Sequence, residues 1–204
     1  MGNVFVFKSM SLDGFIAGPN DENDPLHDWL FTTKPGGRAG VDWDESQGEP
    51  ERFFGPEGIN KEILMEGLTK EGATVVGRRT YEVAKGWGGR PPGNGPYFIL
   101  THNPPPDDEV SSNFTFVTDG IESAVRQAKA ASKSGDIDLM GASLVQQALR
   151  GGLLDKIIVQ VIPVLLGQGI RLFDNLGREH VTLERTRVEA GPAGVTHLFF
   201  DVVH

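Results

Sequence analysis

Short apolar runs alternate with helix-forming segments along the chain, and this alternation constrains the possible fold most strongly. The predicted strands cover residues 3–10, 73–77, 97–101, 114–117, 137–140 and 157–162, with a closing pair at about 181–189 and 195–203. The predicted helices cover residues 57–70, 80–85, 120–134 and 143–150. Strands that are separated by helices run parallel in one sheet, whereas a closing hairpin is antiparallel. The pattern therefore predicts an α/β fold with an open, mostly parallel, twisted sheet, helices on both faces and antiparallel C-terminal strands.

The length of the chain fits one domain. Its 204 residues are enough to bury a substantial core, and the sequence shows neither an internal repeat nor a domain linker. We therefore expect a single domain over residues 1–204, with a long loop insertion at about 18–56. Loops longer than about 12 to 15 residues are uncommon unless they are functional or mobile, so we expect this insertion to cover a substrate.

The charge and the residue types exclude several classes of protein. The net charge of −9 argues against a nucleic-acid-binding surface. The chain has no cysteine, which excludes disulfides and thiolate metal sites, and its five histidines are too scattered to predict any other metal site. The apolar runs are too short to cross a bilayer, and the first residues lack the features of a signal peptide. We expect a cytoplasmic protein that binds a small molecule, and neither nucleic acid nor a membrane.

The segment 136–150 carries the strongest physical indication of a binding site. A predicted strand runs into Gly141 and Ala142, and a helix is predicted to begin at Ser143, which would form a capping box with Gln146. The first turn of a helix has free backbone N–H groups and a partial positive charge, so a diphosphate can bind there. The alternative is that Gly141 and Ala142 only make a tight turn between strand and helix.

Two further predicted strands also end in polar groups. The residues after these strands are Gly77, Arg78, Arg79 and Thr80 in one case, and Thr101, His102 and Asn103 in the other. Arginine can bind a phosphate through two parallel hydrogen bonds, although two solvated arginines on a short helix are an equally ordinary arrangement. Open α/β sheets bind ligands at the carboxyl ends of their strands, so the three strand ends together favour a nucleotide cofactor.

The same residues resemble the motifs of a known superfamily. The segment 76–82 resembles the Gly-Arg-x-Thr motif of dihydrofolate reductases, and the segment 11–17 is similar to the opening of the riboflavin-biosynthesis reductase domain. The segments 141–144, 151–155 and 162–169 resemble the C-terminal signature of that reductase domain. The resemblance extends over roughly residues 3 to 202. It implies the three-layer α/β/α fold of dihydrofolate reductases.

The resemblance also implies an activity and a cofactor. It implies NADPH-dependent hydride transfer to a pteridine- or pyrimidine-like molecule, such as a 5-amino-6-(5-phosphoribosylamino)uracil type of substrate. The residues that it assigns to NADPH are Gly77, Arg78, Arg79 and Thr80 at the phosphates, Thr101, His102 and Asn103 near the adenosine ribose and a 2′-phosphate, and Gly141, Ala142, Ser143 and Leu144 at the diphosphate. Similar reductase domains pair through the region 157–166, which is strongly apolar here, so we expect a homodimer.

Two departures from the family pattern leave a second function open. Ala142 stands where the family has a second glycine, which adds a methyl group where the cofactor should pass. The catalytic carboxylate of dihydrofolate reductases also has no certain equivalent, because Asp28, Glu57 and Glu62 all compete for it. The alternative function is therefore a ligand-binding protein that kept the fold and lost turnover.

Asp13 is our candidate for a catalytic residue. It follows the first strand and should face the same crevice as Gly77 and Gly141. A carboxylate in this position can bind a substrate or help to relay the proton that accompanies a hydride. The alternative is structural, because Asp13-Gly14 is a favoured turn dipeptide in which the aspartate bonds its own backbone.

Overall fold

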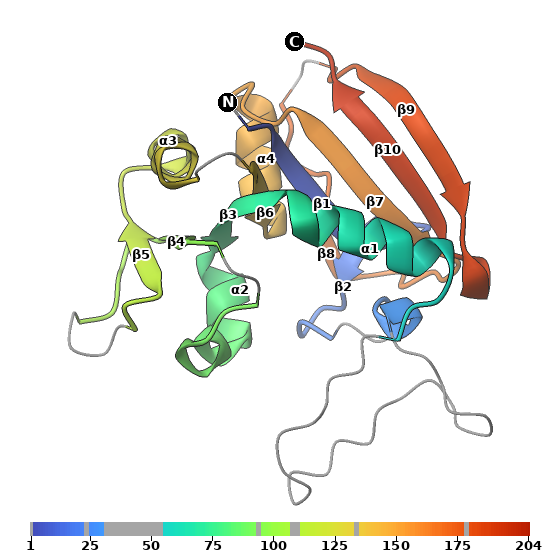
Figure 1. The fold of residues 1–204 in the computed structure, drawn as a ribbon, viewed down its shortest axis with the longest axis horizontal. Helices are drawn as coiled ribbons and strands as arrows, with labels where there is room; N and C mark the ends of the chain where they lie inside the picture. The colour runs from blue at the N-terminus through green and yellow to red at the C-terminus, as the bar shows by residue number, and fades with distance from the viewer. Residues whose placement is uncertain are drawn as a thin grey trace, which may run out of the picture.

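The protein is built around one eight-stranded sheet with a small second sheet beside it (Figure 1). The computed structural model describes residues 2–22, 25–30, 55–92, 95–106, 111–132, 135–177 and 180–204, so most of the insertion expected at about 18–56 lies outside the described residues. The strands are β1 (Val4–Ser11), β2 (Phe15–Ala17), β3 (Glu71–Gly77), β4 (Tyr97–Leu100), β5 (Phe114–Val117), β6 (Asp136–Met140), β7 (Lys156–Ile162), β8 (Ile170–Arg171), β9 (Leu183–Ala190) and β10 (Thr196–Val202). The helices are α1 (Ile59–Lys70), α2 (Arg78–Val83), α3 (Ile121–Ala131) and α4 (Ala142–Arg150), with short 3-10 turns η1 (Asp28–Leu30), η3 (Lys85–Gly89) and η5 (Pro192–Gly194).

The strand order confirms the predicted fold class. The sheet runs β5-β4-β3-β6-β1-β7-β10-β9. The strands from β5 to β7 are all parallel to their neighbours, whereas β10 is antiparallel to both β7 and β9. All the parallel strands therefore end at the same edge of the sheet.

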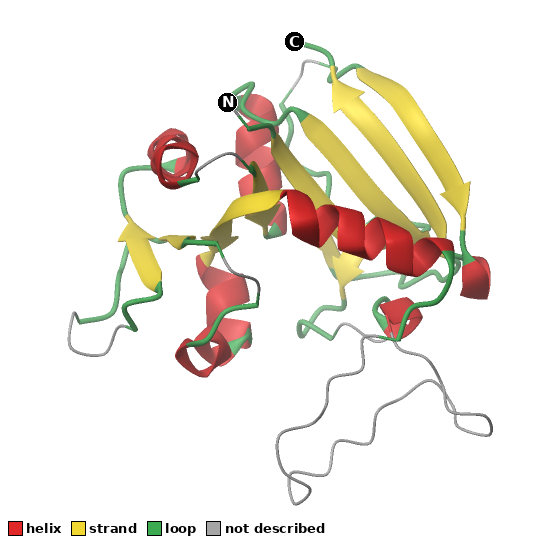
Figure 2. Cartoon of the chain, in the orientation of Figure 1, coloured by secondary structure: helices red, strands yellow, loops and turns green. Residues whose placement is uncertain are grey.

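Helices cover both faces of this sheet, as predicted (Figure 2). Helices α3 and α4 pack on β3, β4 and β6, and their apolar side chains join Val4, Val75 and Leu139 in the main core. Helix α1 lies on the opposite face, where its Gly67 approaches the ring of Phe7. Because side chains alternate along a strand, Val4 and Phe7 point to opposite faces of β1. The arrangement is the three-layer α/β/α fold.

Three details differ from the sequence-based expectations. Helix α4 begins at Ala142 after Gly141 and has no side-chain cap, so the predicted capping box of Ser143 and Gln146 is wrong. The Gln146 amide instead donates hydrogen bonds to the backbone carbonyls of Arg171 and Leu172. Strand β7 lies between β1 and β10 and therefore has no free edge, contrary to our reason for expecting pairing through it. The small β2-β8 sheet was not predicted, because strands this short leave no periodic signal.

Among the helices that the structure describes, none combines the length and the apolar character needed to cross a membrane.

Candidate functional site

The structure brings the three predicted strand ends together at one edge of the sheet. Gly77 at the end of β3 is in register with Leu100 at the end of β4, and Val76 is in register with Met140 at the end of β6. The residues that follow these strands, including Thr101 and Gly141, therefore start from adjacent positions. Parallel strands commonly bind ligands at such an edge.

Gly141 is the closest point of contact between two of these turns. Its backbone has φ 140° and ψ 137°, a conformation that residues other than glycine rarely adopt. A Cβ atom at this position would lie 3.3 Å from the hydroxyl oxygen of Thr80 and 3.7 Å from Cα of Gly77. A Cβ on Gly77 would in turn lie 3.6 Å from Cγ of Leu144. The two turns are thus neighbours. Glycine at positions 77 and 141 allows their backbones to approach each other and the side chains of Thr80 and Leu144.

The first turn of α4 begins beside this contact. Its hydrogen-bond ladder starts with the N–H group of Val145, which donates to the carbonyl of Gly141, so the preceding N–H groups lie outside the ladder. The Ala142 side chain is half-buried and packs against the main core, whereas Ser143 is exposed. The methyl group that distinguishes this chain from the family pattern is therefore accommodated by the core.

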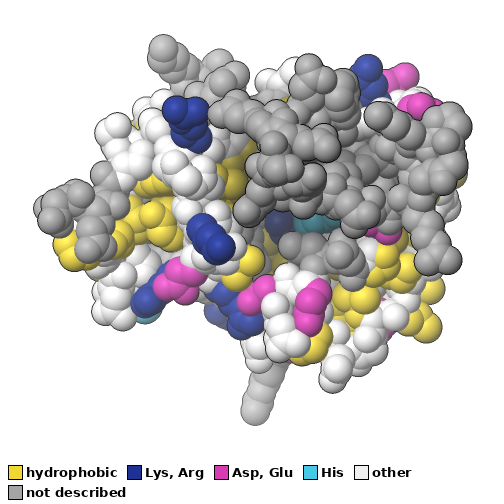
Figure 3. Space-filling model, turned by 90° about the horizontal axis from the view of Figure 1, so that it is seen from below, with side chains coloured by type: hydrophobic (Ala, Val, Ile, Leu, Met, Phe, Trp, Pro, Cys, Tyr) yellow, Lys and Arg dark blue, Asp and Glu magenta, His cyan; other side chains and the backbone are white. Residues whose placement is uncertain are grey.

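Both arginines predicted at the phosphates are paired with carboxylates. Arg78 Nε lies 2.6 Å from Glu82 one turn along α2. Arg79 donates two hydrogen bonds, of 2.7 and 3.0 Å, to the carboxylate of Asp21, and the hydrogen bond to Asp21 raises the pKa of Arg79. Figure 3, which views the molecule from below, shows basic and acidic side chains next to one another on the described surface. Anion binding here must compete with these internal partners.

The residues after β4 divide into one buried and two exposed side chains. The Thr101 side chain is buried, and its hydroxyl group accepts a hydrogen bond from the N–H group of Asn103 at 3.2 Å. Its own N–H group donates to the carbonyl of Val117. His102 and Asn103 are exposed. Thr101 therefore shapes the turn that presents the other two side chains at the edge.

The carboxylate of Asp13 is engaged by its surroundings. It accepts hydrogen bonds from the hydroxyl group of Ser11 at 2.6 Å and from the N–H groups of Leu166 and Gly167 at 3.2 and 2.7 Å. These bonds, with that from Ser11 the strongest, lower the pKa of Asp13. Asp13 thus ties the end of β1 to the loop after β7, a structural role that differs from the local turn offered by the sequence as the alternative. Its catalytic role stays a prediction.

The three candidates for the catalytic carboxylate do not belong to the turns that follow β3, β4 and β6. Asp28 belongs to η1, next to the buried Trp29. Glu57 and Glu62 are exposed, one just before α1 and the other in its first turn. Their assignment as a catalytic acid stays open.

Sequence reasoning missed two ionisable groups that interact inside the sheet region, the buried Asp138 and the half-buried Lys8. β1 and β6 are paired only at Val4–Ile137 and Phe5–Asp138. Asp138 is 7% exposed, and its Oδ1 atom has no hydrogen-bond partner among the described residues. Burial, reinforced by the negative charge of Glu71, raises the pKa of Asp138 to about 7. Burial also lowers the pKa of Lys8. The sequence could have indicated these two groups, because Lys8 and Asp138 are charged residues within the otherwise largely apolar strands β1 and β6.

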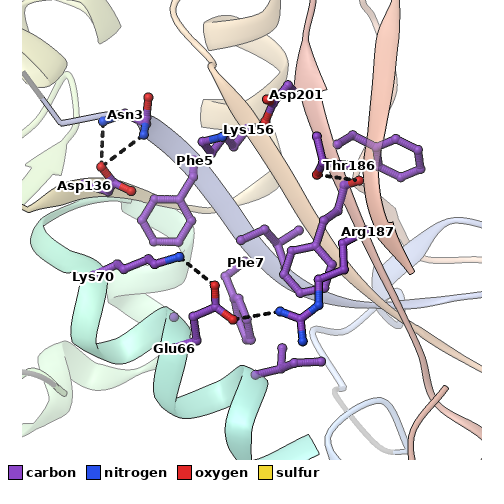
Figure 4. A pocket seen from close by; sticks show the side chains of 15 residues that line it. Asn3, Phe5, Phe7, Glu66, Lys70, Asp136, Lys156, Thr186, Arg187 and Asp201 are labelled. Carbon is purple, nitrogen blue, oxygen red and sulfur yellow. Dashed lines mark hydrogen bonds and ion pairs between the residues drawn. The ribbon is translucent and has the colours of Figure 1, made fainter. Parts of the chain in front are cut away.

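A cavity of about 450 Å³ lies elsewhere, between α1 and the sheet (Figure 4). Phe5, Phe7 and Phe199 line it, and Asn3 marks its position at the opposite ends of the parallel strands. The charged groups at its rim pair with one another: Glu66 bonds both Lys70 and Arg187, and Lys156 bonds Asp201. The carboxylate of Asp136, which also lines the cavity, accepts hydrogen bonds from the backbone and side chain of Asn3. These charged side chains are therefore engaged within the protein. We therefore base the candidate site on the strand ends.

Within the described ranges, no group of three or more histidine, aspartate or glutamate side chains is arranged to hold a metal ion.

Comparison with known proteins gives one family and several relatives. Residues 3–197 match the family described as the RibD C-terminal domain. The uncharacterized protein YwjB of Bacillus subtilis (strain 168) is 28% identical over 175 residues, which cover 85% of this chain and 84% of that protein.

Solved structures with the same fold come from three bacteria. A putative riboflavin biosynthesis protein from Shewanella sp. PV-4 aligns with a TM-score of 0.71 at 20% identity, over 100% of both chains. A pyrimidine reductase-like protein from Corynebacterium diphtheriae has a TM-score of 0.60 at 13% identity, covering 100% of this chain and 92% of that one. A diaminohydroxyphosphoribosylaminopyrimidine deaminase/5-amino-6-(5-phosphoribosylamino)uracil reductase from Thermotoga maritima has a TM-score of 0.61 at 13% identity, over 99% of this chain and 57% of that one.

Proposed function

The chain belongs to the RibD C-terminal domain family, and from this premise we propose that it is an NADPH-dependent reductase of a pyrimidine- or pteridine-like small molecule. The family supports an oxidoreductase of the pyrimidine-reductase type. The name of the Thermotoga maritima protein supports a phosphoribosylaminouracil type of substrate. The cofactor supplies the hydride, while the protein binds and orients both reactants.

The contact at Gly141 is the observation that carries the proposal. A diphosphate needs backbone N–H groups that it can approach closely, and the turn from Gly141 into α4 offers them beside Gly77 and Thr80. The half-buried Ala142 methyl packs on the core, so it is compatible with a diphosphate on the outer side of the turn. These residues fit the phosphate portion of NADPH.

Further polar groups fit the remainder of the cofactor. Ser143 can add a hydroxyl donor at the first turn of α4. The exposed His102 and Asn103 can bind the adenosine ribose and its 2′-phosphate. The ion pairs of Arg78 and Arg79 are exposed, and exposed ion pairs cost little to exchange for a phosphate partner. We expect a preference for NADPH over NADH, because its additional phosphate can exchange with the carboxylate partners of these arginines.

One observation favours the second candidate, a ligand-binding protein without turnover. The carboxylate of Asp13 already accepts three hydrogen bonds from the protein, and its lowered pKa keeps it ionised at neutral pH. It is therefore poorly suited to donate the proton that a reduction requires. A binding protein needs no such donor.

Two measurements test these functions. Calorimetric titration with NADPH and NADH should show tighter binding of NADPH, and failure to bind either would contradict both the cofactor and the reductase. NADPH oxidation should then be followed with a panel of pterins, pyrimidines and nitro-compounds. Substrate-dependent oxidation supports the reductase, whereas binding without oxidation of any kind supports the second candidate.

A further inference from the structure

The ion pair between Asp21 and Arg79 joins two segments that are 58 residues apart in the sequence, one of which carries residues of the candidate cofactor site. Arg79 belongs to α2, which follows β3, while Asp21 belongs to the segment 18–22, which follows β1 and β2. In the sheet, β6 lies between β3 and β1, and β6 ends at the turn of Gly141. The ion pair therefore joins a segment that follows the strand on one side of β6 to a segment that follows β1 and β2 on its other side, with Arg79 Nε and Asp21 Oδ1 2.7 Å apart.

The segment 18–22 holds its shape without help from Arg79. The N–H group of Gly18 donates to the carbonyl of Glu22 at 2.7 Å, and the N–H group of Asp21 donates to the carbonyl of Gly18 at 3.2 Å. The carboxylate of Glu22 accepts two hydrogen bonds from Asn20, both at 2.8 Å. Asp21 has φ 66°, a conformation that aspartate and asparagine tolerate better than most residues. The local hydrogen bonds thus aim the Asp21 carboxylate.

Asp21 uses the edge of Arg79 that would serve a phosphate. A guanidinium group has five N–H donors, and its parallel pairs match the oxygens of carboxylates and phosphates alike. Asp21 occupies the pair formed by Nε and Nη2. The Arg79 side chain is nevertheless 62% exposed, so solvent and a ligand can both reach it. A phosphate can replace the carboxylate without rebuilding the protein.

We propose that Asp21 is an internal competitor for the cofactor's phosphates: it occupies the phosphate-binding edge of Arg79 in the free protein and is displaced when NADPH binds. The inference rests on the proposed function, because it assigns Arg79 to the cofactor. The cofactor then exchanges one anion for another on Arg79. Asp21 weakens cofactor binding, and the segment 18–22 loses its tie to α2 when the cofactor arrives.

The experiment compares Asp21→Asn with the unaltered protein by calorimetric titration with NADPH and, separately, with inorganic pyrophosphate. Asparagine keeps the size of the side chain and tolerates the backbone angle, but it removes the charge that repels the ligand. We expect about three- to fivefold tighter binding of both probes at low salt, because an exposed ion pair no longer has to be broken and a like charge is gone. The gain should shrink at high salt, where exposed charges are screened.

Asp201→Asn is the matched control. It removes the same charge and breaks one exposed ion pair, with Lys156 at 2.7 Å, at the opposite ends of the strands. It should leave both affinities within twofold. A second comparison uses Arg79→Gln, in which the Asp21→Asn substitution should bring a clearly smaller gain, because only the like charge is then removed. Thermal unfolding of each variant separates this effect from a merely structural one.

The outcomes separate the inference from the proposed function. If the unaltered protein binds NADPH and Asp21→Asn binds it equally or more weakly while folded, the inference is overturned and the function stands. If no variant binds NADPH, the function fails, and pyrophosphate alone decides about Asp21. A gain in pyrophosphate affinity that depends on Arg79 would still support the competition, whereas unchanged affinity or no binding would overturn it.

Discussion

The Asp13 carboxylate connects two segments that are distant in sequence at the edge where the strands end. Its two oxygens accept hydrogen bonds from the N–H groups of Leu166 and Gly167 and from the hydroxyl group of Ser11. In Asp13→Asn, one oxygen becomes an amide group that faces an N–H donor. We therefore expect a melting temperature lower by a few degrees and unchanged cofactor affinity, measured by thermal unfolding and calorimetry. If Asp13 also serves the substrate, turnover well below the melting temperature should fall tenfold or more, and full turnover would leave it only the structural role.

Asp138 should make the stability of the protein depend on pH. Its pKa is about 7 in the folded protein, against 3.8 for an ordinary aspartate. Between these two values the folded state keeps a proton that the unfolded state releases. The stability that the protonated Asp138 contributes is therefore lost as the pH rises from about 4 to 7. We therefore compare the free energy of unfolding in urea of Asp138→Asn with that of the unaltered protein. The difference between the two should shift in favour of Asp138→Asn by roughly 2 to 4 kcal/mol between pH 4 and pH 8.

The comparison of Asp138→Asn with the unaltered protein isolates this group from others. Burial lowers the pKa of His197 to about 4, which destabilises the fold as the pH falls from 6.5, but this effect is present in both proteins and cancels. Asp119→Asn, at an exposed aspartate before α3, should show no such pH dependence. An equal effect of Asp138→Asn at both pH values would contradict the buried-acid interpretation.

At the scale of elements, helix α4 offers the sharpest test of the cofactor site. Ser143 is exposed and is the second residue of the helix. An aspartate there is favourable for a helix start, so Ser143→Asp should fold normally. Its charge should repel a diphosphate and weaken NADPH binding tenfold or more, which corresponds to about 1.4 kcal/mol or more. Ser143→Asn is the neutral control, and equal affinities of the two variants would mean that the diphosphate binds elsewhere.

The sequence predicted the elements well where apolar residues repeat with a clear period. Strand β7 and helix α4 have such patterns, and their bounds agree within a residue or two with those expected. The capping of α4 could not be derived, because Gly141 takes the place of a side-chain cap for steric reasons that depend on Thr80 and Gly77. The ion pair of Asp21 with Arg79 could not be foreseen either, since it joins segments whose separation depends on the strand order.

At the scale of the molecule, the predicted homodimer needs a different surface from the one first expected. β7 is an inner strand, while β9 lies at the end of the sheet. β9 has one free edge, and its Leu183 and Val188 side chains are 39% and 45% exposed. A strand at the end of a sheet presents unpaired N–H and C=O groups with which another chain can pair. We predict a dimer at micromolar concentration by light scattering, and Val188→Lys should shift it toward the monomer.

The control for the dimer is Val83→Lys. Val83 lies on α2 and is 49% exposed. The substitution therefore adds the same charge at a similarly exposed valine away from β9. This variant should remain dimeric. A monomeric unaltered protein, or an equal effect of both lysines, would count against pairing through β9.

The position of β1 in the sheet has a consequence for the order in which the protein forms. The first strand pairs along its length with β7, where Phe5 is in register with Lys156 and Ser11 with Ile162. On the ribosome, β1 emerges long before its principal partner, and contacts between residues so far apart in sequence close slowly. The centre of the sheet can therefore assemble only after three quarters of the chain has been synthesised, and until then the apolar β1 remains exposed to chaperones and to aggregation.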